Sequence, residues 1–117
     1  MMDESTIRGL LDVERAETLA RIQAMQADLD AIIDSSANAN TDDEHDPEGS
    51  TIAYERARVA ALLEGAQSNL ADIDGALGRL AAGDYSFCER CHSQISAERL
   101  AALPVGRTCF DCANSST

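Results

Sequence analysis

The chain has 117 residues, of which 44% are hydrophobic but only 3% are aromatic. Bulky side chains for one globular core are therefore scarce, which favours elongated helices or a small domain held together by something other than a large core. Nine arginines and no lysine stand against 21 Asp and Glu residues, so the formal net charge is −12. Such a charge is repelled by phosphate backbones and by anionic lipid, which argues against nucleic acid or a membrane surface as the primary ligand.

No stretch of the sequence approaches the ~20 apolar residues of a membrane-spanning helix. The first ten residues include Asp3 and Glu4 and lack the basic and apolar regions of a secretion signal. We therefore expect a cytoplasmic protein, and in that compartment four cysteines are not expected to form structural disulfides.

Residues 5–36 predict the first of two long helices, which Ser5 or the preceding Asp3 can cap. Apolar residues in its second half alternate steps of three and four, the spacing of a coiled coil, at Ile22, Met25, Leu29 and Ile32. This stripe predicts a helix that packs against another helix along its length.

Residues 51–82 predict the second long helix, with Ser50 or Thr51 as its cap and Gly83 at its end. Its apolar stripe has the same spacing and comprises Val59, Leu62, Ala66, Leu70, Ile73, Leu77 and Leu80. Three glycines inside this helix each cost about 1 kcal/mol relative to alanine. They are Gly65, Gly75 and Gly78, and we interpret them as permitting close packing, with a hinge as the weaker alternative.

Between the helices, residues 37–50 (ANANTDDEHDPEGS) are rich in turn-forming types. Two amphipathic helices of matched length joined by a polar loop are expected to fold back as an antiparallel hairpin with the loop at its tip. From Asp34 to Ser50 there are six carboxylates and no Lys or Arg; the carboxylates are Asp34, Asp42, Asp43, Glu44, Asp46 and Glu48. A merely solvated connector is the alternative interpretation of such a loop.

All four cysteines follow the hairpin, in a second domain predicted over residues 84–117 with one short helix near Ser96–Leu103. The pattern C-x-x-C, seventeen residues, C-x-x-C is typical of a four-thiolate zinc site formed by Cys88, Cys91, Cys109 and Cys112. Four cysteine ligands leave no position for water, so the zinc is expected to be structural. A thioredoxin-type redox pair would need a βαβ context, which the sequence does not show.

Other charged residues of this segment have less specific roles. We expect Arg90, Arg99 and Arg107 either to donate to the zinc-bound sulfurs or to be ordinary surface arginines. His92 follows Cys91 but is not needed as a ligand. Residues 85–117 hold three acidic and three basic side chains without a basic stripe, which favours docking to protein over nucleic acid.

The run GDYSFCERCHSQISAERLAALPVGRTCFDC, residues 83–112, resembles the finger signature of the DksA/TraR family. After the first C-x-x-C, the family's I-x-x-x-R-L-x-A-x-P segment is matched at Ile95, Arg99, Leu100, Ala102 and Pro104. The resemblance implies an all-α fold in which a long antiparallel coiled-coil hairpin, residues 1–83, precedes a C4 zinc finger.

Members of this family bind bacterial RNA polymerase, insert the hairpin into its secondary channel and alter initiation without being enzymes. The resemblance implies the same for this chain. A hairpin that satisfies its own apolar stripes is expected to be a monomer, and the acidic composition argues against sequence-specific contact with nucleic acid. Its tip residues would be Asp43, Asp46 and Glu48, with Glu48 where the family's D-x-x-D-x-A motif has alanine. Basic residues that bind an alarmone in some members are replaced here by Gly65, Asp72 and Ala113.

Two other functions are compatible with the residues. The chain could be a zinc-stabilised helical adaptor for a different protein, with the acidic loop as a solubilising connector. It could also act in thiol redox chemistry or in transcript cleavage, although bound zinc would suppress thiol reactivity.

Overall fold

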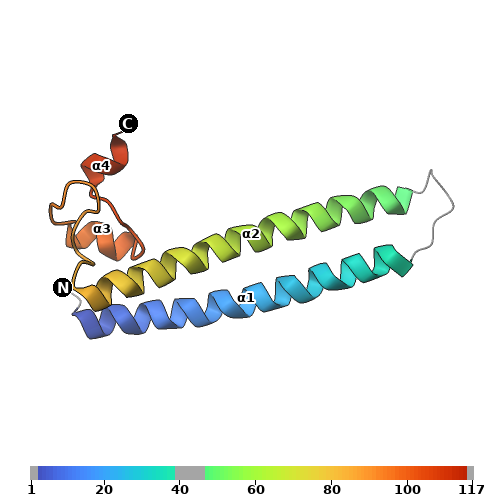
Figure 1. Ribbon diagram of the computed structural model, residues 1–117, viewed down its shortest axis with the longest axis horizontal. Helices are drawn as coiled ribbons and strands as arrows, with labels where there is room; N and C mark the ends of the chain where they lie inside the picture. The colour runs from blue at the N-terminus through green and yellow to red at the C-terminus, as the bar shows by residue number, and fades with distance from the viewer. Residues whose placement is uncertain (1–2, 39–46, 116–117) are drawn as a thin grey trace. The chain divides into compact units, whose positions relative to one another are not determined.

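The computed structural model describes residues 3–38 and 47–115, with side chains from 3–35 and 51–115. Figure 1 shows the four helices in chain order, α1 (Glu4–Asn38), α2 (Pro47–Ala82), α3 (Ala97–Ala102) and α4 (Phe110–Asn114). The two long helices pack together and the cysteines follow them, so the predicted fold class is confirmed. Within the described ranges the only β pairing is an isolated antiparallel bridge between Phe87 and Gln94.

The helix ends follow their local sequence. Asp3, rather than Ser5, caps α1, because its Oδ1 accepts the backbone N–H of Thr6 at 2.8 Å. The same interaction lowers the pKa of Asp3. Helix α2 begins at Pro47, four residues earlier than predicted, because the first turn of a helix does not need the N–H that proline lacks. Gly83, with φ of 84°, ends α2 in the left-handed conformation expected of it.

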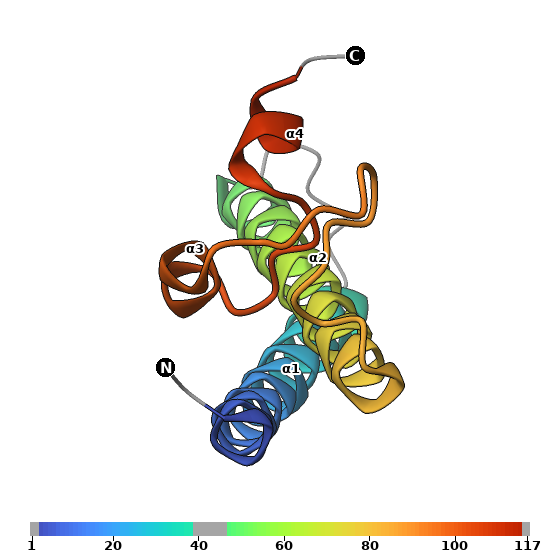
Figure 2. The ribbon, with the colours of Figure 1, turned by 90° about the vertical axis from the view of Figure 1, so that its left-hand side faces the viewer.

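The chain divides into two compact units. The first contains Met1–Ala16 and Leu70–Thr117, and therefore joins the start of α1, the end of α2 and the cysteine segment. Its buried core consists of Leu11, Ile73, Ala76, Leu80 and Tyr85, with Leu100 and Val105 packed against it. The finger thus shares one core with the helix ends. Figure 2 shows α3 beside the end of α2 and α4 above it.

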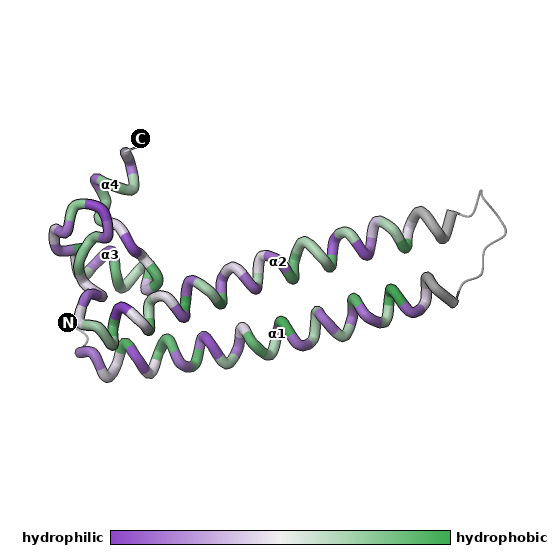
Figure 3. The backbone as a smooth tube through the Cα atoms, viewed as in Figure 1, coloured by the Kyte–Doolittle hydropathy of each residue, from purple (hydrophilic) through white to green (hydrophobic). Residues whose placement is uncertain are grey.

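The second unit, Glu17–Asn69, contains the remaining parts of both helices. The four apolar residues predicted to face inward from α1 in this unit are half-buried. On α2 the prediction for Leu62 is wrong, because Leu62 is 49% exposed whereas Leu63 is 7% exposed. A step of four from the buried Val59 keeps Leu63 on the inner face, and a step of three places Leu62 farther round the helix. Figure 3 shows the alternation of hydrophobic and hydrophilic residues along both helices.

Among the described helices, none combines the length and apolar character needed to cross a membrane.

In the first unit, α1 and α2 are also joined by an ion pair of 2.6 Å between Arg15 and Asp74. Both side chains are partly exposed, so this pair contributes little to stability.

The glycines of α2 differ in their surroundings, which generates a prediction. A Cβ at Gly78 would meet no atom within 4 Å, whereas a Cβ at Gly75 would lie 3.2 Å from Nη2 of Arg107 and 3.4 Å from Nη1 of Arg79. Gly78→Ala should therefore raise the free energy of unfolding by roughly 0.5–1 kcal/mol. Gly75→Ala should raise the free energy of unfolding by less than half of that amount, because the guanidinium groups of Arg79 and Arg107 must shift to make room for the new methyl group.

Urea unfolding of the two variants beside the wild type measures the difference. Gly65→Ala serves as a second reference, because the space around Gly65 is also open within 4 Å. Equal stabilisation by the alanines at positions 75 and 78 would show that the arginines over Gly75 move at no cost.

Candidate metal centre

The first C-x-x-C segment is shaped by backbone hydrogen bonds. The N–H of Cys88 donates to the carbonyl of Ser93 at 2.8 Å, and the N–H of Ile95 donates to the carbonyl of Ser86 at 2.7 Å. These bonds fold residues 86–95 into a tight knuckle. Its turn is closed by His92, whose N–H donates to the carbonyl of Cys88 at 2.9 Å. His92 has a φ of 65°, in the left-handed region that favours glycine.

The second C-x-x-C segment is the start of helix α4, which the sequence analysis did not predict. Cys109 is its N-cap, and its Sγ accepts the N–H of Cys112 at 3.5 Å. A side chain that caps a helix lies over the first turn, so Cys109 and Cys112 present their sulfurs on the same side. The signal available in the sequence was the C-x-x-C itself, because a thiolate accepts helix N–H groups as Ser or Asp does.

The two knuckles bring all four predicted ligands together. The sulfurs of Cys88, Cys91, Cys109 and Cys112 lie within 4.8 Å of one another, and those of Cys91 and Cys109 are 3.7 Å apart. Four sulfurs bound tetrahedrally at a Zn–S distance of ~2.3 Å would be separated by roughly 3.8 Å. The set therefore fits a structural zinc ion, with Cys88 buried and Cys91 exposed.

The electrostatics of the cluster also favour a cation. Backbone N–H donors, above all that of Cys91, lower the pKa of Cys88 to about 6. The neighbouring sulfurs of Cys109 and Cys91 raise the pKa of Cys112 to about 12. Thiolates this close repel one another, so all four can ionise together only when a metal ion compensates their charge. When bound, zinc would supply that compensation and tie the two knuckles together.

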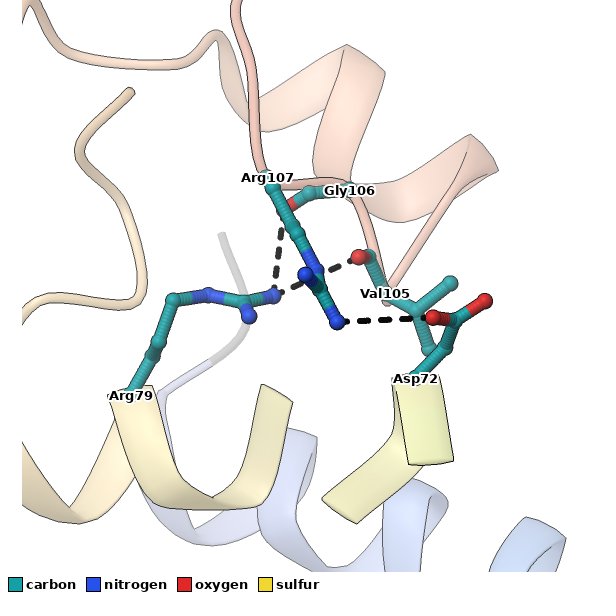
Figure 4. A network of polar contacts seen from close by, with 5 residues as sticks. All are labelled: Asp72, Arg79, Val105, Gly106 and Arg107. Atoms are coloured by element: carbon teal, nitrogen blue, oxygen red, sulfur yellow. Dashed lines mark hydrogen bonds and ion pairs between the residues drawn. The ribbon is translucent and has the colours of Figure 1, made fainter. Parts of the chain in front are cut away.

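The segment that carries the second knuckle is held by hydrogen bonds to its carbonyl groups. Tyr85 donates its hydroxyl to the carbonyl of Pro104 at 2.8 Å. Arg79 donates Nη2 to the carbonyls of Val105 at 3.3 Å and Gly106 at 3.4 Å, as Figure 4 shows. These contacts connect α2 and the chain that follows it to residues 104–106. We call residues 104–112 the strap.

Two of the predicted arginines also hold the strap. Arg99 donates Nε to the carbonyl of Thr108 at 2.9 Å, and Arg90 donates Nη1 to the carbonyl of Cys112 at 3.2 Å. The guanidinium groups therefore bind main-chain oxygens in these contacts, and it is the backbone N–H of Arg90 that reaches Cys88 Sγ, at 3.4 Å. Arg107 instead pairs with Asp72 on α2 at 3.4 Å.

Sequence reasoning missed Arg79 and Tyr85, the two residues that fix the strap to the core. Burial raises the pKa of Tyr85, and burial followed by the nearby charge of Arg107 lowers the pKa of Arg79. Nothing in the helical pattern of α2 distinguishes Arg79 from a surface arginine. Its contacts depend on a loop that follows 26 residues later.

The predicted tip residues are not placed by the structure. Asp43 and Asp46 lie outside the described residues, and Glu48 falls within α2 but its side chain is outside them. Their role remains a prediction.

Zinc content tests the metal centre. The wild type should retain one zinc ion per chain after dialysis, and Cys109→Ser should lose it, because three thiolates and a hydroxyl bind zinc far less tightly. His92→Asn is the matched control, since asparagine tolerates the left-handed conformation and the four sulfurs remain. Loss of zinc from the His92 variant, with Cys109→Ser retaining it, would contradict the assigned ligand set.

The hydrogen bond of Tyr85 generates a second prediction. Tyr85→Phe removes the donor and takes this partner from the carbonyl of the half-buried Pro104, so the free energy of unfolding should fall by about 1 kcal/mol. Tyr54→Phe is the control, because Tyr54 is 70% exposed and should change stability little. If Tyr85→Phe and Tyr54→Phe change the melting temperature equally, the hydrogen bond from Tyr85 to Pro104 does not stabilise the strap.

Comparisons with known proteins agree with this geometry. Residues 83–117 match the family model described as the prokaryotic dksA/traR C4-type zinc finger. The solved structure of transcription factor DksA2 from Pseudomonas aeruginosa is similar, with a TM-score of 0.79 and 28% sequence identity, over 94% of this chain and 79% of that one.

Two curated proteins are also similar. An uncharacterised protein of Aquifex aeolicus (strain VF5) is 44% identical over 46 residues, which cover 39% of this chain and 32% of that protein. The uncharacterised protein YteA of Bacillus subtilis (strain 168) is 35% identical over 75 residues, which cover 64% of this chain and 31% of YteA. The matches thus span about a third of the length of these relatives.

Proposed function

Because residues 83–117 form a DksA/TraR C4-type zinc finger, we propose that this chain is a transcription regulator that binds bacterial RNA polymerase. It acts by placing the acidic loop of its hairpin in the secondary channel and modulating initiation. The observation that carries the proposal is the likeness to transcription factor DksA2, which extends over the long helices as well as the finger.

The chemistry of the chain supports this mode of action. The tip of the hairpin concentrates carboxylates, with Asp43 and Asp46 between the two long helices, Glu48 at the start of α2, and no Lys or Arg beside them. Carboxylate oxygens are the ligands that magnesium ions prefer, so a loop of this composition is suited to act near a magnesium-dependent catalytic centre. The net charge of −12 favours a protein surface over nucleic acid as the docking site.

The finger has a structural role in this proposal. Four sulfurs complete the coordination of a zinc ion and leave no position for a substrate or an activated water. The regulator is therefore not an enzyme. Its finger instead stabilises the unit in which the ends of α1 and α2 share a core with Tyr85.

Variants of the loop test the proposal. Asp43→Asn with Asp46→Asn should abolish the effect on promoter output in transcription with purified polymerase, because the amides keep the size of the side chains but remove their charge. Zinc content and unfolding should not change. The control is Glu17→Gln with Asp28→Asn, which removes two charges from exposed positions of α1. A loop variant as active as this control would refute the role of the tip.

A further inference from the structure

The first unit contains a hollow that the metal centre does not use. It has a volume of about 410 Å³ and lies beside the first knuckle. Its lining residues come from the end of α2, from the link that follows it and from the knuckle, and they are Arg79, Asp84, Phe87, Cys88, Glu89 and His92. A hollow of this size can receive a long side chain of another molecule.

The lining has an excess of negative charge. Asp84 and Glu89 contribute two carboxylates, against the single guanidinium of Arg79. Arg79 directs Nη2 to the carbonyls of Val105 and Gly106 in the strap, as Figure 4 shows. One cationic group entering the hollow would therefore balance its charge.

Phe87 adds an aromatic face to this hollow. Three of the four aromatic side chains in the protein are exposed, and Phe87 is 47% exposed although bulky core residues are scarce. Its backbone is fixed by an N–H bond to the carbonyl of Asp84 at 3.1 Å and by the bridge to Gln94. An aromatic ring held beside carboxylates is a favourable site for a guanidinium group, which stacks on the ring face.

The conformation of His92 is consistent with a contact surface here. Its φ of 65° would suit glycine, yet the position carries a ring that lines the hollow. That conformation closes the turn of the first knuckle, where the N–H of His92 donates to the carbonyl of Cys88 at 2.9 Å, and it fixes the position of the ring.

The cation must come from outside the finger. The chain has no lysine, and the three arginines of the finger are engaged elsewhere. Arg90 and Arg99 donate to carbonyls of the strap, and Arg107 pairs with Asp72. Among the described residues that line the hollow, Arg79 is the one arginine.

We infer that this hollow receives an arginine side chain of a partner protein, held between the carboxylates of Asp84 and Glu89 and the ring of Phe87. That the partner is RNA polymerase rests on the proposed function. The contact would orient the finger on its partner, because a bidentate guanidinium fixes direction as well as distance.

The recognition of arginine can be tested without the polymerase. In the ¹⁵N-labelled, zinc-loaded full chain, N-acetyl-arginine amide should shift the backbone resonances of residues 84–92, and N-acetyl-citrulline amide, its neutral analogue, should not. Asp84→Asn with Glu89→Gln should abolish the shifts. Equal shifts with citrulline, or shifts that map elsewhere, would overturn the inference.

Binding to core RNA polymerase tests the partner. The double variant at Asp84 and Glu89, and Phe87→Leu, should each raise Kd by at least about tenfold, as loss of a charged or aromatic anchor does. The matched control is Glu98→Gln with Asp111→Asn, two exposed carboxylates of the finger outside the hollow, which should bind like the wild type.

The outcomes separate the two proposals. If the wild type binds polymerase and the hollow variants bind equally well, the inference fails and the proposed function stands. If the arginine probe maps to the hollow but the wild type does not bind polymerase, the hollow is supported and the proposed function fails.

Discussion

Four cysteine sulfurs within 4.8 Å of one another are the constraint around which the finger is arranged. Their mutual repulsion as thiolates needs a cation, and their positions need two knuckles that bring the sulfurs together. Backbone pairing fixes the first knuckle and the helix cap of Cys109 fixes the second. The strap then depends on Arg79, Arg90 and Arg99, whose guanidinium groups donate hydrogen bonds to its carbonyl oxygens.

This arrangement compensates for a core that is small. The first unit buries only a few large side chains, and one of them, Tyr85, also donates a hydrogen bond to the strap. Arginine suits this role better than lysine, because its planar group offers several donors in fixed directions and its stem packs against apolar neighbours. The sequence uses arginine alone as its long basic residue. Aromatic side chains are left largely at the surface, where they are available to a partner.

Much of this structure follows from local sequence rules. The long helices, the cap at Ser96, the turn at Gly83 and the four ligands were all predictable, because each depends on spacing or on one residue type. Leu62 was misplaced because the stripe of α2 could be continued through either of two adjacent leucines, and only packing decides between them. Contacts of Arg79 and Tyr85 with the strap were not predictable, since they join residues far apart in the chain. The loop carboxylates Asp43 and Asp46 remain a sequence-based prediction.

Zinc and arginine side chains hold the finger together with the ends of α1 and α2, and the acidic loop joins the same two helices. The hairpin can present this loop to a partner protein. The central claim is that this partner is RNA polymerase and that the loop enters its secondary channel. The most direct measurement is binding of the zinc-loaded chain to core RNA polymerase in competition with a known secondary-channel factor. Mutually exclusive binding is the predicted result. Simultaneous binding of both proteins, or no binding by a folded chain that retains its zinc, would contradict the account.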